Sequence, residues 1–237
     1  MNQECIENGQ FLDPKYQRAL WDRQHAYRGE NFGREDLLKN DPTQSARMFH
    51  DLMPRGAKII EVGSGNGRDA RFWALRGHSI VCIDFSEIAL RQLSRTAREQ
   101  GVIERITPIV YDINSGWLPF ETGKNFDGFY ARSALHVSDD TMISLTRAID
   151  CQLKPGGKVL ILGKSLCDEK IQRSERLENG LAIDHEEGGH VRRIWTPEFM
   201  KQMCEVVQWR LLSIDYSGEV INNRGSEYIT MIAQKYE

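Results

Sequence analysis

Short apolar runs alternate with longer amphipathic segments through the middle of the chain. Five apolar runs have the length of buried strands and lie at 57–62, 79–83, 106–111, 126–131 and 157–162. Between them, apolar residues recur at helical spacing, which predicts helices at 68–76, 86–100 and 139–153. Strands that alternate with helices form a mostly parallel sheet with helices on both faces, so we expect a doubly wound α/β fold.

The end of the chain follows a different pattern. Two strand-like runs, 207–216 and 226–234, surround the turn-rich Asn222-Asn223-Arg224-Gly225. They predict an antiparallel C-terminal hairpin at the edge of the sheet. Two segments fall outside the alternation, and we expect them to be additions to a single domain spanning 1–237. The polar, aromatic segment 1–55 is expected to form a helical cap, and the charged segment 164–194 an insertion after the fifth strand.

Composition narrows the classes of protein that fit this pattern. Among 237 residues, 31 Lys and Arg are nearly balanced by 34 Asp and Glu, which argues against a nucleic-acid binder. No apolar run approaches the ~20 residues that cross a bilayer, and the first residues lack the pattern of a signal peptide. The five cysteines form no C-x-x-C pair, which predicts free thiols in a reducing compartment. We therefore expect a cytoplasmic protein.

The glycine-rich segment after the first strand carries the clearest chemical signal. Gly63, Gly65 and Gly67 alternate, and Glu61 stands two residues before the first of them. Glycines between a strand and a helix let a ligand approach the backbone closely. A dinucleotide fingerprint needs a glycine where this chain has Arg68, so a nicotinamide-dependent enzyme is disfavoured.

The segment resembles motif I of the class I S-adenosylmethionine-dependent methyltransferases, an acid followed by G-x-G-x-G. Asp84 ends the second strand, 17 residues after Gly67, where a carboxylate can accept hydrogen bonds from both ribose hydroxyls. Asp112 follows the third strand, where the family reads adenine, and 153–157 looks like its turn into strand five. The resemblance covers about 55–163 and, loosely, the hairpin, and implies a Rossmann-like fold.

The resemblance implies S-adenosyl-L-methionine as cofactor. The cofactor-binding candidates are Trp21, Glu61, Gly63, Ser64, Gly65, Gly67, Arg68, Asp84, Phe85, Ser86, Asp112, Ile113 and Ala131. Two of the acidic residues have an alternative interpretation. Asp84 could instead stabilise the N-terminus of the following helix through the helix dipole, and Asp112 could instead form a turn. The segment 21–27 is similar to the leading segment of thiopurine, tellurite-resistance and capsule-associated methyltransferases, which closes over the donor, although aromatics in a first helix also serve packing.

Catalytic and acceptor-binding candidates follow the fourth and fifth strands. Arg132 and His136 are four residues apart at the carboxyl end of a strand, and His136 is a candidate base, or alternatively a structural histidine. The catalytic candidates are His136, His190, Arg132 and Tyr27, and the substrate-binding candidates are His185, Arg192 and Arg193. No metal is expected, because H-E-E-G-G-H at 185–190 is not H-E-x-x-H. The segment 164–194 is expected to be a mobile acceptor lid, with a solvated loop as the alternative.

These observations predict a methyltransferase that acts on a small polar metabolite, anionic ones included, and binds neither nucleic acid nor membrane. Two alternatives keep the same fold. A sulfonium can also be attacked internally, which would give a cyclase or lyase that releases methylthioadenosine. A catalytically silent binding protein is the other alternative, against which the intact glycine motif argues.

Overall fold

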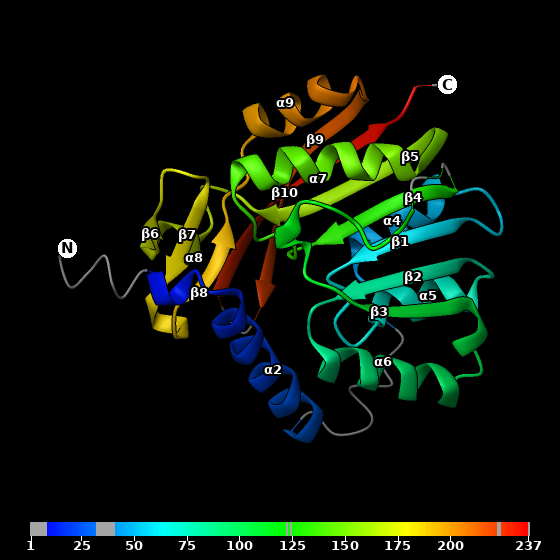
Figure 1. The fold of residues 1–237 in the computed structure, drawn as a ribbon, viewed down its shortest axis with the longest axis horizontal. Helices are drawn as coiled ribbons and strands as arrows, with labels where there is room; N and C mark the ends of the chain where they lie inside the picture. Colours follow the sequence, from blue (N-terminus) through cyan, green and yellow to red (C-terminus); the bar gives the residue numbers. More distant parts are fainter. Residues whose placement is uncertain (1–8, 32–40, 122, 124, 222–223, 237) are drawn as a thin grey trace.

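The structure is a computed structural model that describes residues 9–31, 41–121, 123, 125–221 and 224–236. Its centre is a seven-stranded sheet (Figure 1) with the order β3 (Ile106–Val110), β2 (Ser79–Asp84), β1 (Lys58–Val62), β4 (Phe126–Arg132), β5 (Leu153–Lys164), β10 (Arg224–Gln234) and β9 (Arg210–Ile221). The first five strands pair in parallel, whereas β10 is antiparallel to both β5 and β9. The predicted fold class, mostly parallel with a C-terminal antiparallel hairpin, is confirmed.

Helices cover both faces of this sheet. On one face, α4 (Gln44–Leu52), α5 (Arg68–Leu75) and α6 (Glu87–Glu99) pack against the strands through buried residues such as Phe49, Trp73 and Leu93. On the other face, α7 (Asp139–Gln152) and α9 (Pro197–Val207) pack through Leu145, Met200 and neighbouring apolar residues. Short 3-10 turns at Ile103–Arg105 and Ile113–Ser115 flank β3. The two apolar clusters therefore hold a rigid sheet whose carboxyl ends are free to build a site.

The capping residues explain why the predicted helices begin where they do. Ser86 accepts the Ala89 N–H at the start of α6, and Ser138 accepts the Thr141 N–H at the start of α7. The predicted strand 207–216 was wrong at its start, because Val207 ends α9, a helix that the apolar pattern did not reveal. Part of the predicted turn, at 222–223, lies outside the described residues, as does Cys5.

The charged segment after β5 folds into a small sheet of its own. It contains α8 (Glu169–Arg173), a 3-10 turn at His185–Glu187 and the antiparallel strands β6 (Glu175–Arg176), β7 (Leu181–Asp184) and β8 (His190–Arg193). All residues of β7 and β8 are buried, so a solvated loop is the wrong interpretation for these strands. Its apolar core consists of Leu181, Ile183 and Val191, with Phe11 and Leu177 packed against them.

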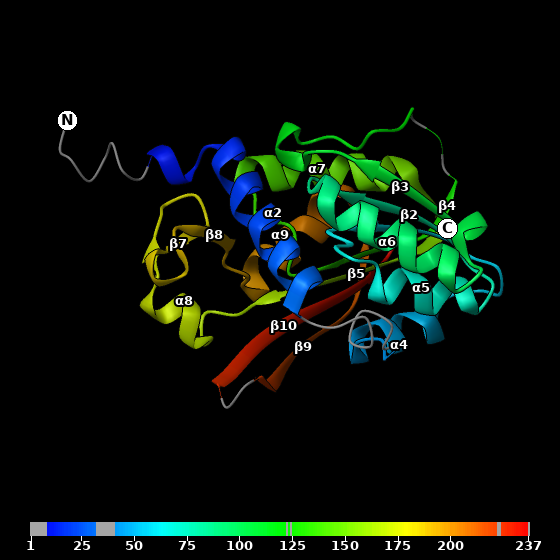
Figure 2. The same cartoon turned by 90° about the horizontal axis from the view of Figure 1, so that it is seen from below.

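The helix α2 (Pro14–Asn31) bridges this small sheet and the main fold. In both views it runs from β8 to α6 (Figures 1 and 2). At one end, the Gln17 side chain donates to the Gly189 carbonyl at 2.8 Å, and at the other the Gln92 side chain donates to the His25 carbonyl at 3.0 Å. Among the described helices, none is both long and apolar enough to cross a bilayer.

Candidate active site

A cavity of about 910 Å³ opens at the carboxyl ends of the parallel strands. Strand order reverses between β1 and β4, and such a switch point is where open α/β sheets bind ligands. Its walls come from the glycine loop, the ends of β2, β3 and β4, the helix α2 and the small sheet. One end, beside the glycine loop and Asp84, is called the donor end below, and the other, beside Arg132 and the small sheet, the acceptor end.

The glycine loop owes its shape to three residues with left-handed backbone. Gly63, Gly65 and Gly67 have φ values of 71°, 53° and 75°, which side chains rarely adopt. A Cβ on Gly63 would lie 2.0 Å from the Cβ of Ala134, and one on Gly67 would lie 2.4 Å from Leu93 Cγ. These two glycines therefore allow close packing, whereas Gly65 faces the cavity.

Asp84 joins the glycine loop to the end of β2. Its Oδ2 accepts the Gly65 N–H at 2.9 Å and its Oδ1 accepts the Ser86 N–H at 2.9 Å. Burial raises the pKa of Asp84, and these two N–H groups act in the opposite direction. Each carboxylate oxygen has two lone pairs, so both keep capacity for a further donor from the cavity. The hydroxyl of Ser86 donates to Asp22 of α2 at 2.5 Å.

Glu61 lies behind the glycine loop and does not line the cavity. It is almost fully buried in β1, and burial, with the nearby charges of Asp69 and Asp84, raises its pKa well above its ordinary value. Other predicted cofactor residues also stay outside the cavity wall: Ser64, Gly67, Arg68, Ser86 and Ala131. Their part in cofactor binding stays a prediction.

Seven predicted cofactor residues do line the cavity: Trp21, Gly63, Gly65, Asp84, Phe85, Asp112 and Ile113. Asp112 begins the 3-10 turn after β3, where its Oδ1 accepts the Asn114 N–H at 3.0 Å and the Asn114 side-chain amide at 2.8 Å. The turn-forming role considered for Asp112 is therefore observed. Its contact with adenine stays a prediction.

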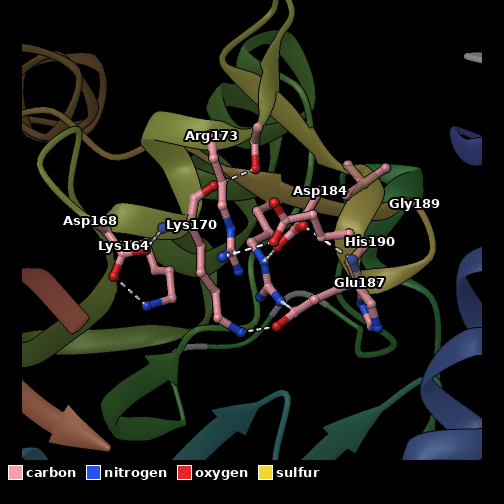
Figure 3. Close-up of polar contacts among 12 residues, drawn as sticks. Lys164, Asp168, Lys170, Arg173, Asp184, Glu187, Gly189 and His190 are labelled. Carbon is pink, nitrogen blue, oxygen red and sulfur yellow. Dashed lines mark hydrogen bonds and ion pairs between the residues drawn. The ribbon is translucent and has the colours of Figure 1, made fainter. Parts of the chain in front are cut away.

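The acceptor end gathers cationic side chains. Arg132, Lys164, Lys170 and Arg192 line it together with one carboxylate, Glu187. Glu187 forms ion pairs with both Lys170 and Arg192, and Figure 3 shows the Lys170 side chain reaching from α8 to Glu187. Burial acts to raise the pKa of Glu187, but hydrogen bonds and charges from Lys170 and Arg192 lower it to about 2.

Lys164 is held at the carboxyl end of β5. Its ammonium donates to Asp168 Oδ2 at 2.6 Å and to Ser226 Oγ of β10 at 3.2 Å (Figure 3 draws the Asp168 contact). The ammonium also lies 4.5 Å from the centre of the Tyr228 ring. Both partners are buried, so the position of this charge is well defined.

His136 and His190 both contact Trp21 of α2. The Trp21 and His136 rings are stacked, with centroids 6.3 Å apart and an interplanar angle of 11°, and His190 meets Trp21 edge-on at 4.8 Å. His136 lines the cavity, whereas His190 is fully buried outside its wall, with Nε2 2.8 Å from the Gln24 amide nitrogen. The candidate catalytic histidines thus have different access to a ligand.

Three predicted site residues point away from the cavity. Arg193 is buried and donates to the Val137 carbonyl at 2.8 Å and to Asp139 at 2.6 Å, because alternation along β8 places it on the face opposite Arg192. Arg193 therefore lies outside the cavity wall, and its predicted contact with an acceptor anion stays untested. His185 contacts Glu175 at 2.9 Å outside the cavity wall, and Tyr27 is 63% exposed and also outside it.

Several residues of the cavity wall were not predicted from the sequence. Gln17, Gln24 and His25 come from α2, Lys164 and Lys170 from the charged segment, and Ser226 and Tyr228 from β10. Lys164 could have been found, because it follows the fifth strand where ligands bind. Ser226 and Tyr228 of β10 do not follow a parallel strand, so their positions in the sequence did not indicate a binding site. Within the described part of the chain, no group of three or more His, Cys, Asp or Glu residues is placed to hold a metal ion.

Comparison with known proteins agrees with the fold and the glycine motif. Residues 59–157 match the family model described as a methyltransferase domain. Over 188 residues the chain is 24% identical to the sarcosine/dimethylglycine N-methyltransferase of Aphanothece halophytica, a match that covers 78% of this chain and 63% of that protein. The chain thus spans less than two thirds of this curated relative.

Solved structures show the same fold. A 1,6-didemethyltoxoflavin-N1-methyltransferase from Burkholderia thailandensis, with bound 1,6-didemethyltoxoflavin and S-adenosylhomocysteine, has a TM-score of 0.65 at 18% identity, covering 95% of this chain and 92% of its own. An S-adenosylmethionine-dependent methyltransferase from Methanosarcina mazei has a TM-score of 0.67 at 18% identity, covering 80% and 97%. Residues 59–157 therefore match a methyltransferase domain and the solved structures share its fold, so the predicted resemblance to class I S-adenosylmethionine-dependent methyltransferases is confirmed.

Proposed function

We propose that this protein transfers a methyl group from S-adenosylmethionine to a small polar acceptor that carries an anionic group. The observation that carries the proposal is a single cavity that joins the glycine loop and Asp84 to a cluster of four cationic side chains. Donor and acceptor would lie in one space, as an in-line displacement requires.

The residues at the donor end fit the cofactor. Asp84 retains lone pairs toward the cavity for the ribose hydroxyls, and Phe85 and Ile113 offer apolar surface beside Asp112 for the adenine. At Gly65, an added Cβ would have only His25 within 4 Å, so the backbone there is open to a close approach. When bound, S-adenosylmethionine supplies a methyl group already activated by the positive charge on sulfur. The chain then has to orient the acceptor and exclude water.

The charges at the acceptor end favour an anion. Four cationic side chains line this end and one carboxylate, Glu187, does so. Asp168 and Asp184, outside the wall, lie beside Lys164 and Arg192, so a smaller positive excess remains for an anionic group on the acceptor to compensate. The curated relative is named for sarcosine and dimethylglycine, which are small carboxylates. A cavity of 910 Å³ has the size of small-molecule sites, in line with a metabolite as the acceptor.

We further propose that residues 164–194 and α2 act as the acceptor lid and the N-terminal cap of one methyltransferase domain. Lys170, Leu181, Val191 and Arg192 of the small sheet region line the cavity, and so does Trp21 of α2. Entry of ligands would require these walls to separate from the main sheet.

Titration calorimetry with S-adenosylhomocysteine tests the donor site, and incubation of S-adenosylmethionine with a panel of small carboxylates tests the reaction. We expect binding and formation of S-adenosylhomocysteine. Release of methylthioadenosine would support the cyclase or lyase alternative instead. Donor binding without turnover of any panel member would favour a binding protein, and no binding at millimolar donor would contradict the proposal.

A further inference from the structure

The loop that follows β4 places His136 between the donor and acceptor ends of the cavity. Its Ala134 packs against Gly63 of the glycine loop, and the Ser133 N–H donates to the Leu162 carbonyl of β5 at 2.7 Å. Among the described residues two histidines line the cavity, His25 of α2 beside Gly65 at the donor end and His136 at the acceptor end. His136 is therefore the natural candidate for a general base at the acceptor end.

The hydrogen bonding of the ring determines where its proton lies. The backbone N–H of Arg193 donates to Nδ1 of His136 at 3.2 Å. A nitrogen that accepts a hydrogen bond carries no proton, so the neutral ring carries its proton on Nε2. Nε2 is buried and has no hydrogen-bond partner in the structure as described. The one nitrogen that could accept a proton is thus already occupied by a fixed backbone donor.

The surroundings of the ring also oppose a second proton. Burial is the largest cause, and the charges of Arg192, His190 and Arg193 add to it. Together they lower the pKa of His136 to about 3, although a hydrogen bond with the Ser133 backbone acts to raise it. These groups all belong to β8 or to the loop itself, and Trp21 of α2 covers the ring without adding a charge. Near neutral pH the ring is neutral and stays so.

The remaining titratable groups of the acceptor end are also unsuited to act as a general base in place of His136. Glu187 is tied to two cations, and they hold its pKa at about 2. Lys164 and Lys170 carry ammonium groups that are paired with the carboxylates of Asp168 and Glu187, and an ammonium group has no lone pair to accept a proton. Arg132 and Arg192 are guanidinium groups, which do not act as bases, and Tyr228 is a phenol that accepts a proton only after ionisation.

We infer that the acceptor reaches this site with an available lone pair on the attacking atom, as an amine, an aromatic nitrogen or an ionised oxygen, and not as a hydroxyl that the protein must deprotonate. This inference rests on the proposed function. In the transfer, the acceptor's lone pair forms the bond to the methyl carbon, and the carbon–sulfur bond breaks with its electron pair left on sulfur. An aliphatic amine is an ammonium ion near neutral pH, so it loses one proton to solvent before the transfer. If the methylated nitrogen still carries a hydrogen, it can release a further proton to solvent afterwards. His136 is then a donor that orients polar groups and not the base.

Matched acceptor pairs test this inference. Two pairs are suitable, glycine with glycolate and 2-aminobenzoate with 2-hydroxybenzoate. Within each pair the carboxylate is kept and an amine is exchanged for a hydroxyl. With S-adenosylmethionine, we expect mass spectrometry to find methyl on nitrogen or carboxylate oxygen and none as a hydroxyl ether. His136→Gln, which retains a side-chain N–H donor, should keep the rate to within about tenfold. An ether product that is lost by about 100-fold or more in His136→Gln would overturn the inference.

The protonation of His136 is measured separately from turnover. Nitrogen-15 NMR of the full chain, with and without S-adenosylhomocysteine, should show the Nε2–H tautomer and no titration of this ring between pH 5 and pH 8. A titration midpoint between pH 6 and pH 7 would overturn the inference even if no panel member is methylated. Failure to bind S-adenosylhomocysteine would instead contradict the proposed function and leave the NMR result as it stands.

Discussion

Asp84 is the residue on which we expect donor recognition to depend most. Its two oxygens already organise the backbone at Gly65 and Ser86, and the proposal adds two hydroxyls of a ribose to the same carboxylate. Asp84→Ala should weaken S-adenosylhomocysteine binding by tenfold or more, because hydrogen bonds to a charged group contribute roughly 1.5–3 kcal/mol each at most. Calorimetry measures the change, and Asp84→Asn separates the loss of charge from the loss of shape. Unchanged affinity in a variant that circular dichroism shows to be folded would remove Asp84 from the site.

Because the pKa of His136 is low, we expect the stability of the protein to depend on pH in the acid range. The folded ring has a pKa of about 3, and an unfolded histidine has a pKa of about 6.5, so between these values only the unfolded state binds the proton. The free energy of unfolding should therefore fall as pH is lowered from 6.5 toward 3, by at most about 1.4 kcal/mol per pH unit from this residue.

Urea unfolding at a series of pH values, for wild type and His136→Gln, measures this slope. The variant should lose the part of the slope that lies between pH 3 and pH 6.5, and above pH 6.5 the two curves should run parallel. Identical slopes at acid pH would show that the folded ring binds a proton as readily as the unfolded one.

At the scale of elements, the contact between the glycine loop and the loop after β4 joins the two halves of the site. Gly63→Ala would place a Cβ 2.0 Å from Ala134 at a φ of 71°, so both loops would have to move. We expect lower stability and weaker S-adenosylhomocysteine binding. Gly56→Ala is the matched control, because Gly56 has a φ of 68° and open space around it. The control should show only the cost of left-handed backbone, about 1–2 kcal/mol, and unchanged donor affinity.

Equal effects of the two alanine substitutions on donor affinity would contradict a role for this loop contact. Denaturant unfolding separates the stability effects, and calorimetry separates the affinity effects.

The same elements show what could be predicted from the sequence. The parallel strands were predictable because strands buried on both faces read as continuous apolar runs, and Asp84 and the glycine loop stand at their ends. The small sheet was not, because the buried faces of β7 and β8 include Asp184, His190, Arg192 and Arg193. The charge of Arg193 is compensated by Asp139, which is distant in sequence, and a local pattern does not contain that pairing.

At the scale of the whole molecule, α2 connects the donor end with the small sheet. Asp22 accepts from Ser86 beside Asp84, and on the same helix Trp21 contacts both His136 and His190. Binding of S-adenosylhomocysteine should therefore protect backbone amides of 181–193 from hydrogen exchange as well as those of the glycine loop. Trp21→Ala should lose the protection in 181–193 and retain it in 63–67.

Arg18→Ala is the matched control for this experiment, because Arg18 is exposed on α2 and lies outside the cavity wall. It should show the wild-type pattern of exchange. Protection of 181–193 that persists in Trp21→Ala would mean that the small sheet responds to the donor by another route.

The position of β10 has a consequence for how the protein is synthesised. This strand follows every other strand in the chain, yet it pairs inside the sheet between β5 and β9, and it brings Ser226 and Tyr228 to the cavity. The glycine loop, Asp84 and Asp112 leave the ribosome long before these two residues. A nascent chain that ends after β9 already carries the described donor end and still lacks one wall of the acceptor end. The residues of the donor end and the β10 wall of the acceptor end are therefore synthesised at different times, and those of the donor end come first.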